Sequence, residues 1–376
     1  MVMSAAPALP GFVTTEGTRF LLNGRDYRVA GANNYYLGFA GDSAVEAVLD
    51  LAQEMGLNTL RTWAFLDCGA AAPGATPENA QNGVFFHYWS PALGMPAFHD
   101  GPHGLERLDR TIAWAGQRGL RLILPLVNYW SDFGGVDQYL QWFGLTGRDE
   151  FFIHPEVKSA YRGYLEHLAL RVNTRTGRRY RDEPAILAWE LINEPHCASR
   201  DGRLVAWVEE MSAFLKRLDP NHLIGVGDEG YVRQTRWPWK RRLYNPHSGA
   251  DWKRLLAAPA IDFGTCHLYP APASKEDPAR SGRRRIREHL KAGRSAGKPV
   301  LVEEFGVKMD TDRASRDNVY RAWLDELVKN EGAGAAVWMI ASSFEDGALY
   351  PDYDGYTIYS AGEVPALVSF AGSDRI

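Results

Sequence analysis

The sequence has few cysteines and no metal-binding spacing. Its 376 residues include three cysteines, Cys68, Cys197 and Cys266, and no CxxC pair. Three thiols cannot all pair with one another, so no disulfide scaffold is specified, although a bond between two of them stays open. The histidines follow no HExxH or comparable ligand spacing. We therefore expect neither a metal nor another cofactor.

The sequence also lacks a basic excess and long apolar runs. Its 42 Lys+Arg against 46 Asp+Glu give a net charge of −4, whereas nucleic-acid-binding domains are usually strongly basic. The longest apolar runs, such as residues 122–127, are far shorter than the ~20 residues of a membrane helix. Residues 1–10 lack the basic and apolar regions of a secretory signal. We expect no nucleic-acid or membrane partner and a cytoplasmic protein, or a secreted one if a signal has been removed; the oligomeric state stays open.

What is present is a repeated alternation of two patterns. With 45% hydrophobic and 12% aromatic residues the chain can bury a core, which excludes disorder. Short apolar runs, each ending in a polar or aromatic cluster, alternate with stretches of helical periodicity. The apolar runs cover residues 27–32, 59–63, 121–128, 186–193, 223–228, 262–267, 299–304 and 335–340.

Alternation of apolar strands and amphipathic helices predicts a parallel sheet covered by helices. Eight units favour an α/β fold of the (β/α)₈ TIM-barrel type, which typically needs about 250 residues, as one domain over residues 1–376. An open doubly wound sheet is the alternative, but no GxGxxG opens a helix after the first strand. Residues 12–22 alternate like a β-hairpin that would close the bottom of the barrel, and the long 69–103 segment is a candidate functional loop.

Polar and aromatic residues follow seven of the eight apolar runs, at the end where barrel enzymes place their chemistry. These residues are Arg61, Thr62 and Trp63; Asn128, Tyr129 and Trp130; Asn193 and Glu194; Asp228 and Glu229; His267 and Tyr269; Glu303 and Glu304; and Trp338. A carboxylate after an apolar strand is costly to bury without a partner, so Glu194 and Glu304 each need a reason to be there.

Hydrolysis of a glycosidic bond supplies that reason. It needs one protonated carboxyl group and one carboxylate, about 5–5.5 Å apart in a retaining enzyme. Strands four and seven of a barrel lie on opposite sides, so Glu194 and Glu304 can face each other across its mouth. Arg61 and His267 would hold one of them ionised, and Asn193 would donate to a sugar hydroxyl. The aromatic residues suited to stacking on sugars are Trp63, Trp130, Tyr269 and Trp338.

At these positions the sequence resembles glycoside hydrolase family 5 of clan A, and within it the β-mannanase group. The strings that carry the resemblance are WELINEP at 189–195 followed by HC, EFG at 304–306, GANNYY at 31–36, RTWAF at 61–65, and LVN at 126–128 with DFGG at 132–135. An isolated NEP is weak evidence, whereas NEP and EFG at strands four and seven form a strong pair.

The resemblance implies a role for each matching position. Glu194 corresponds to the general acid/base and Glu304 to the nucleophile of a retaining double displacement, with Glu303 a bystander on the other face of its strand. Glu194 then needs a raised pKa while Glu304 is ionised. The implied substrate contacts are Asn193 at the 2-hydroxyl, Arg61, His267 and Tyr269 around the carboxylates, Trp338 beneath the sugar at the scissile bond, and Asn128 and Trp130 further along the cleft. Glu229 receives no role.

The expected activity is cleavage of β-1,4-mannosidic bonds in mannan, glucomannan or manno-oligosaccharides, with β-mannan or a manno-oligosaccharide as the partner. Three alternatives stay open from sequence: an exo-acting β-mannosidase or mannobiohydrolase on short oligosaccharides, a β-1,4-glucanase, and a carbohydrate-binding barrel without activity. Transglycosylation also competes with hydrolysis. The paired glutamates argue against a mere binding protein, which has no need of two such carboxylates.

Overall fold

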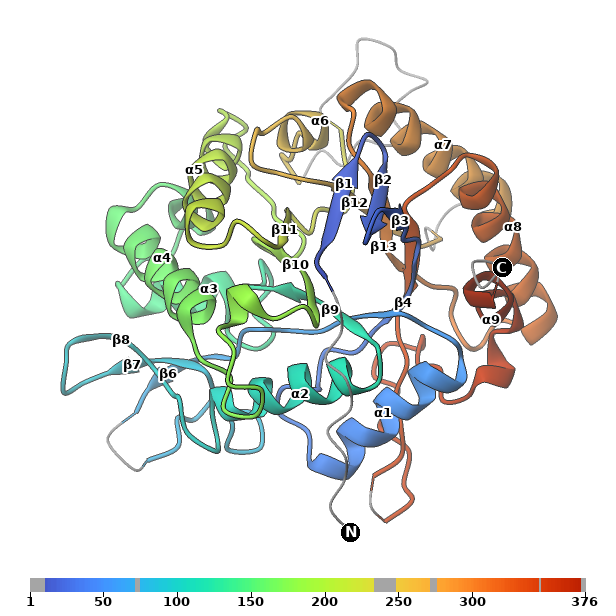
Figure 1. Cartoon of the computed structure of the whole chain (residues 1–376). Helices are drawn as coiled ribbons and strands as arrows, with labels where there is room; N and C mark the ends of the chain where they lie inside the picture. Colours follow the sequence, from blue (N-terminus) through green and yellow to red (C-terminus); the bar gives the residue numbers. More distant parts are fainter. Residues whose placement is uncertain (1–10, 72–74, 233–247, 271–275, 345, 373–376) are drawn as a thin grey trace.

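Eight parallel strands form the centre of the structure and helices surround them (Figure 1). The computed structural model describes residues 11–71, 75–232, 248–270, 276–344 and 346–372. The strands are β4 (Val29–Asn33), β5 (Thr59–Arg61), β9 (Arg121–Pro125), β10 (Ile186–Glu190), β11 (Leu223–Gly225), β12 (Gly264–Leu268), β13 (Val300–Phe305) and β14 (Gly334–Val337). All their residues are buried, as expected for strands that are apolar on both faces.

The sheet is nearly closed into a barrel. Its hydrogen-bonded order is β11-β10-β9-β5-β4-β14-β13-β12, so β11 and β12 are the two edges among the described strands. Single backbone bonds join these edges, from Asp262 N to Ile224 O at 2.8 Å and from His267 N to Glu229 O at 3.1 Å. The predicted (β/α)₈ architecture is confirmed, and each of the eight apolar runs contains one strand.

Helices with one buried face pack around the sheet. They are α1 (Asp42–Glu54), α2 (Leu105–Gln117), α3 (Gly135–Trp142), α4 (Pro155–Leu170), α5 (Arg203–Leu218), α6 (Trp252–Leu256), α7 (Pro278–Ala296), α8 (Arg313–Lys329) and α9 (Pro365–Gly372). In α1 the buried Val45, Val48, Leu49 and Ala52 repeat at three and four, as predicted. The periodicity did not predict α3 and α9, because eight residues give barely two turns. Among the described residues, no helix is both long and apolar enough to cross a membrane.

The N-terminal hairpin closes one end of the barrel, as predicted. Strand β1 (Val13–Glu16) pairs antiparallel with β2 (Arg19–Leu22), which in turn pairs with β3 (Arg25–Asp26). Val13 and Phe20 are 2% and 1% exposed, and they pack with Val29, Leu301 and other residues in the lower half of the barrel. Figure 1 shows the hairpin lying across this end. The opposite end is therefore the open one.

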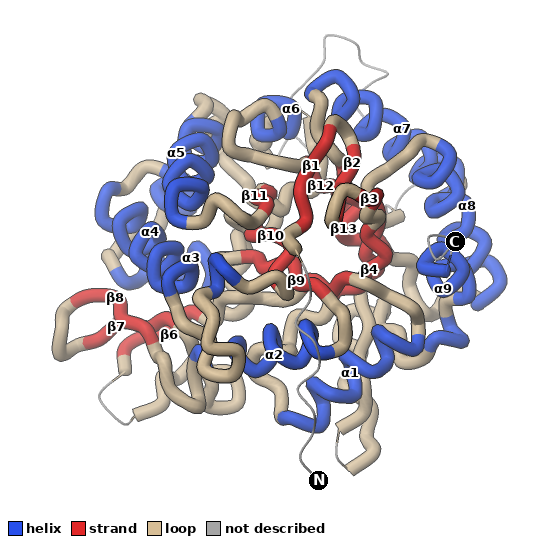
Figure 2. Tube along the Cα trace, viewed as in Figure 1, coloured by secondary structure: helices blue, strands red, loops and turns tan. Residues whose placement is uncertain are grey.

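The 69–103 segment, predicted as a long loop, contains regular structure instead. Strand β6 (Asp67–Ala70) pairs parallel with β7 (His87–Ser90), which pairs antiparallel with β8 (Met95–Phe98). This small sheet lies outside the ring of helices (Figure 2) and contacts α3 and α4: His87 stacks on Tyr164 with a centroid distance of 4.8 Å, and Phe98 on His167 at 4.1 Å. Each of the three strands has only four residues, too few to show a clear alternation in the sequence.

Candidate active site

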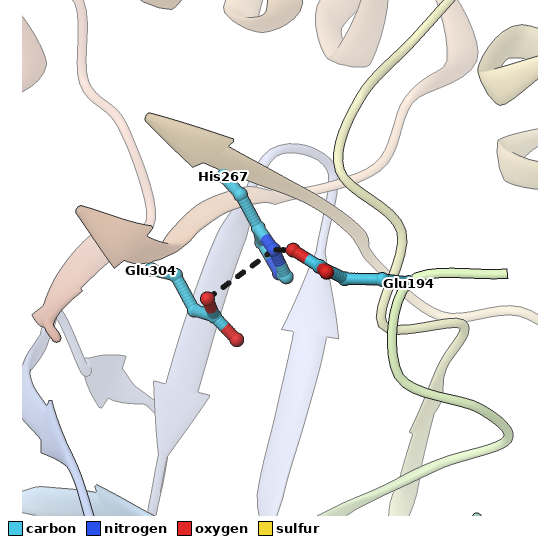
Figure 3. Close-up of side chains that lie close together, drawn as sticks. All are labelled: Glu194, His267 and Glu304. Atoms are coloured by element: carbon cyan, nitrogen blue, oxygen red, sulfur yellow. Dashed lines mark hydrogen bonds and ion pairs between the residues drawn. The ribbon is translucent and has the colours of Figure 1, made fainter. Parts of the chain in front are cut away.

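The two predicted catalytic glutamates face each other at the carboxyl-terminal end of the barrel, with His267 between them (Figure 3). Glu194 follows β10, Glu304 lies in β13 and His267 in β12. His267 Nδ1 is 2.5 Å from Glu194 Oε1 and 3.4 Å from Glu304 Oε2. One oxygen of each glutamate lies within 4.8 Å of the other. This spacing is that of a retaining glycosidase, since inverting enzymes hold their carboxyl groups about 6.5–9.5 Å apart.

Glu194 is placed by an unusual backbone. Its φ is 50°, in the left-handed region that disfavours residues with a side chain. The adjacent loop holds this conformation, because Glu194 N donates to Gly227 O at 2.7 Å. A Cβ at Gly227 would lie 2.5 Å from Ile192 O, so only glycine permits this approach. The loop after β11 thus aims the Glu194 carboxyl group into the barrel mouth.

Every oxygen of the two catalytic carboxyl groups accepts a hydrogen bond. Glu194 Oε2 accepts from the Trp130 indole at 2.7 Å, and His267 serves Oε1. Glu304 Oε1 accepts from Arg61 Nη1 at 2.8 Å, and Oε2 accepts from the Tyr269 hydroxyl at 2.8 Å. The structure therefore brings Arg61, His267 and Tyr269 together around the pair, as predicted, and places Trp130 there as well. Trp130, expected to stack on sugar, also acts as a hydrogen-bond donor here.

Arg61 and Asn193 form a polar layer below the glutamates. Arg61 is 1% exposed, and its Nη2 donates to Asn193 Oδ1 at 2.7 Å. Asn193 Nδ2 donates to Asn128 Oδ1 at 3.0 Å, so Asn128 orients Asn193. An amide group carries two N–H donors, and Asn193 uses one of them here. The other is the donor for a sugar hydroxyl that the sequence predicts.

The pKa values of this cluster differ from the sequence-based expectation. Burial raises the pKa of Glu194, but hydrogen bonds from His267 and Trp130 outweigh it and leave that pKa lowered. Burial raises the pKa of Glu304. Burial also disfavours the His267 imidazolium, yet the surrounding Glu304, Glu194 and Glu303 carboxylates raise its pKa well above 6.5. The sequence predicts a raised pKa at Glu194, whereas the hydrogen bonds from His267 and Trp130 lower it.

Glu303 is no bystander, so that prediction is also wrong. Its side chain is fully buried, with Oε1 3.0 Å from His267 Nε2 and Oε2 3.6 Å from Arg61 Nε. The cause is a break in strand register: β12 and β13 shift between Cys266 and His267, so strict alternation ends before the strand does. Glu190, which ends β10, was not predicted at all, yet its Oε2 accepts from Arg61 Nε at 2.8 Å.

Glu194, His267 and Glu304 also have a spacing that suits a cation. Each carboxylate oxygen, however, already accepts a hydrogen bond from a protein donor, and Arg61 brings positive charge to the same place. The carboxylate oxygens are thus hydrogen-bonded by protein donors, and the cluster combines an acid and a base. This arrangement fits proton transfer at a glycosidic oxygen.

Comparison with known proteins agrees with this geometry. The model of the family described as GH family 5 beta-mannosidase-like matches residues 10–339. The chain belongs to glycoside hydrolase family 5. The predicted family and enzyme class are thereby confirmed, and the retaining mechanism is typical of this family.

Three members of glycoside hydrolase family 5 illustrate the similarity. Mannan endo-1,4-beta-mannosidase F of Aspergillus clavatus is 36% identical over 350 residues, which cover 93% of this chain and 75% of that protein. Mannan endo-1,4-beta-mannosidase 8 of Oryza sativa subsp. japonica is 35% identical over 391 residues, covering 96% and 99%. The X-ray structure of the endo-beta-1,4-mannanase from Thermotoga petrophila has a TM-score of 0.83 and 38% identity, covering 94% of this chain and 79% of that one.

Within this family 5 site, the predicted aromatic residues differ in accessibility. Trp63 is 4% exposed and packs against Arg61 and Trp338, with centroid distances of 5.0 and 6.1 Å, so it supports its neighbours from below. Trp338 is partly exposed, and its indole donates to Asp354 Oδ2 at 2.7 Å. Trp338 is thus the better placed of the two to contact a sugar.

Sequence reasoning missed an aromatic band that continues outward from Trp338. Tyr35 stacks on Trp338 at 6.1 Å, and its hydroxyl receives a 3.0 Å hydrogen bond from Tyr350. Tyr350 in turn contacts Tyr353 at 6.0 Å and Phe344 at 5.7 Å. Tyr353 is 76% exposed. Residues 344–353 follow the last barrel strand, and the cluster of tyrosines there was the available signal.

A second pair lies beside Trp130. His196 Nε2 is 2.7 Å from Glu229 Oε2, and the His196 ring stacks on Tyr129 at 5.1 Å and meets Trp130 edge-on at 5.1 Å. Glu229, which the sequence left without a role, is therefore the hydrogen-bond partner of the residue two positions after Glu194.

Proposed function

We propose that this family 5 enzyme hydrolyses β-1,4-mannosidic bonds in mannan, glucomannan or manno-oligosaccharides, with retention at the anomeric carbon. The observation that carries the mechanism is the separation of at most 4.8 Å between oxygens of Glu194 and Glu304. The mannan substrate is supported by the names of the relatives, which are mannan endo-1,4-beta-mannosidases at 36% and 35% identity over most of the chain.

In the first half-reaction, Glu304 attacks the anomeric carbon while the bond to the leaving oxygen breaks. Glu194 gives its proton to that oxygen, and a glycosyl ester of Glu304 forms. In the second half-reaction, Glu194 takes a proton from water, the water oxygen attacks the anomeric carbon, and Glu304 leaves as a carboxylate. Both glutamates thus end in their starting states.

The surrounding residues assist specific atoms in these steps. Arg61 and Tyr269 hold the Glu304 carboxylate and orient it for attack, each through one 2.8 Å hydrogen bond. Asn193 donates its remaining N–H to the hydroxyl next to the anomeric carbon. Trp338 offers a ring face to the sugar at the scissile bond, and Tyr35 and Tyr353 extend that surface to further sugar units.

A time-resolved product profile tests the function. Mannohexaose, mannobiose and cellohexaose are incubated in parallel with the enzyme, and the products are separated over time. Internal cuts in mannohexaose, giving several product lengths at once, support the endo-mannanase. Stepwise release of mannose or mannobiose would replace it with an exo enzyme, and cleavage of cellohexaose alone would replace the mannan substrate with a β-1,4-glucan.

A further inference from the structure

A second pair of carboxyl groups lies directly beneath the catalytic pair. Glu190 and Glu303 are both fully buried, and each influences the pKa of the other. Arg61 Nε contacts both of them, at 2.8 Å to Glu190 and 3.6 Å to Glu303. Burying two carboxylates is costly unless they are compensated, and one guanidinium, which also serves Glu304, does not compensate both.

If Glu190 and Glu303 share one proton, only one of them is charged, and the cost of burying two carboxylates is avoided. Glu190 Oε1 and Glu303 Oε2 are buried oxygens that find no hydrogen-bond partner among the residues the structure describes. Two carboxyl groups in contact do not both ionise, and a proton between them supplies the missing donor. Burial raises the pKa of Glu190 well above 4.5. Burial also raises the pKa of Glu303, but Arg61 and the hydrogen bonds from Glu190 and His267 outweigh burial and lower this pKa to about 2. These directions, together with the 3.0 Å contact of Glu303 Oε1 with His267 Nε2, assign the proton to Glu190 and leave Glu303 ionised.

An ionised Glu303 dictates which nitrogen of His267 carries hydrogen. A carboxylate only accepts, so the 3.0 Å contact from His267 Nε2 to Glu303 Oε1 requires a proton on Nε2. The other nitrogen, Nδ1, lies 2.5 Å from Glu194 Oε1. Nδ1 is then the atom that exchanges a proton with Glu194.

We propose that Glu190 and Glu303 are a positioning pair for the acid/base: protonated Glu190 donates to Glu303, and ionised Glu303 fixes His267 so that Nδ1 shares its proton with Glu194. Neither residue touches the sugar. During the first half-reaction the shared proton passes from Glu194 to the leaving oxygen, and the water of the second half-reaction returns one. This inference rests on the proposed function of Glu194 and Glu304.

The other groups that face this cluster define its electrostatic setting. Burial raises the pKa of Asp228, which follows β11, to about 8. Arg285 on α7 donates to the His267 carbonyl at 3.0 Å. Other titratable or charged neighbours are Arg61 on β5, Glu229 and Tyr231 after β11, and Tyr269 after β12. The carboxyl groups closest to His267 are Glu194, Glu303 and Glu304.

Two isosteric substitutions distinguish the role of Glu190 from that of Glu303. Glu190→Gln keeps an oxygen for Arg61 and a neutral donor for Glu303, so the basic limb of the kcat/KM profile stays in place. Glu303→Gln removes the charge that stabilises protonated His267, so this limb moves down by about one pH unit. Because proton donation suffers, kcat falls roughly 10²-fold on mannohexaose and much less on aryl mannosides with good leaving groups. Glu326→Gln is the control, because this buried glutamate on α8 pairs with Arg287 at 3.0 Å, away from the site.

An equal shift of the basic limb in both isosteric variants would place the proton elsewhere and overturn the inference. The inference would also be overturned if Glu303→Gln left the basic limb in place and lowered kcat equally on mannohexaose and on aryl mannosides. That result would indicate a structural role for Glu303. Thermal unfolding of each variant checks its fold.

A second measurement needs no folded variant at these positions. ¹⁵N NMR of histidine-labelled wild-type enzyme, with His267 assigned from its loss in His267→Asn, should show Nε2 protonated from about pH 5 to about pH 9. An unprotonated Nε2 in that range would overturn the inference. If the wild-type enzyme is inactive on every saccharide, the proposed function is wrong. If it is active but His267 Nε2 is unprotonated, only the proposal for Glu190 and Glu303 is wrong.

Discussion

The indole N–H of Trp130 donates a 2.7 Å hydrogen bond to Glu194 Oε2. This contact stabilises the ionised form of the acid/base and lowers its pKa. In Trp130→Phe the ring remains and the donor is lost, so the pKa of Glu194 rises. The basic limb of the pH profile should move up by about one unit, since a hydrogen bond to a charged group is worth about 1.5–3 kcal/mol. Trp89→Phe, on β7 outside the barrel, is the control and leaves the limb unchanged; a downward shift in Trp130→Phe would contradict the assignment.

Tyr269 acts on the other glutamate in the same direction. Its hydroxyl donates to Glu304 Oε2 at 2.8 Å and lowers the pKa of the nucleophile, which must be ionised to attack. Tyr269→Phe therefore moves the acidic limb of the kcat/KM profile to higher pH and lowers kcat about tenfold. Tyr356→Phe alters a neighbouring ring 5.3 Å away and should leave the acidic limb in place. An acidic limb that does not move in Tyr269→Phe would remove Tyr269 from this role.

The nucleophile is tested by chemical rescue. Glu304→Ala should lose hydrolysis while keeping its fold, because the carboxylate that attacks the anomeric carbon is gone. Azide occupies the vacated space and restores some turnover, and the product is a glycosyl azide of inverted configuration, which NMR identifies. Full activity without azide would exclude Glu304 as the nucleophile.

The acid is tested by leaving-group dependence. Glu194→Ala should slow hydrolysis of manno-oligosaccharides roughly 10²–10⁴-fold and affect aryl mannosides with good leaving groups far less, since these leave without a proton. Glu288→Ala, at an exposed position of α7, serves as the control. Equal losses on both substrate types would count against Glu194 as the acid.

The aromatic band should contribute to binding of long substrates. Tyr353 is 76% exposed and contacts Tyr350 at 6.0 Å, so Tyr353→Ala removes a ring face without opening the core. KM for mannohexaose should rise severalfold, whereas mannobiose, too short to reach it, should be unaffected. Leu93→Ala, which removes a side chain that is 66% exposed in the β7–β8 turn, tests whether loss of any exposed apolar group has this effect. A rise in KM for both lengths would contradict the band.

Buried His87 in the β6–β8 sheet should, by itself, lower stability in acid. His87 is buried 3.4 Å from Asp67, and burial lowers its pKa to about 3. Below about pH 6.5 the histidine is protonated in the unfolded chain, whereas in the folded chain His87 stays neutral down to about pH 3. The free energy of unfolding therefore decreases by about 1.4 kcal/mol for each unit of falling pH in this range. His87→Phe keeps the stacking on Tyr164 and should flatten the unfolding free energy by that slope between about pH 6 and 4. His103→Phe, at an exposed position, is the control and should leave that slope unchanged. Identical slopes in His87→Phe and wild type would exclude His87 as the cause of the acid sensitivity.

Much of the site could be predicted because strand ends of a barrel meet at one rim. The positions of Glu194, Glu304, Arg61 and His267 followed from that rule alone, and the family resemblance supplied proposed roles. Glu303 was misplaced because alternation along β13 stops at the register shift near its end. Such a shift depends on hydrogen bonds between strands far apart in sequence, which a single-sequence pattern does not contain.

The pKa of Glu194 was misjudged for a related reason. The sequence identified the like-charged partner Glu304, from which a raised pKa was expected. It did not identify the donors His267 and Trp130, which lower the pKa of Glu194. Those contacts arise from the left-handed backbone of Glu194. The aromatic band, likewise, needs the loop after β14 to fold back on Tyr35, a tertiary contact across most of the chain.

The junction between β11 and β12 gives the barrel a weak point. Single backbone bonds and the Thr265 hydroxyl, which bonds to the backbone of Asp228 at 2.8 and 2.9 Å, join the two edges in place of a ladder. Local opening is easiest where few hydrogen bonds must break, so amide exchange at this junction should exceed that of β9 and β10. His267 belongs to one of these edges. Local opening at this junction would displace the histidine proposed to share a proton with Glu194, so heating should abolish catalysis before the barrel as a whole unfolds.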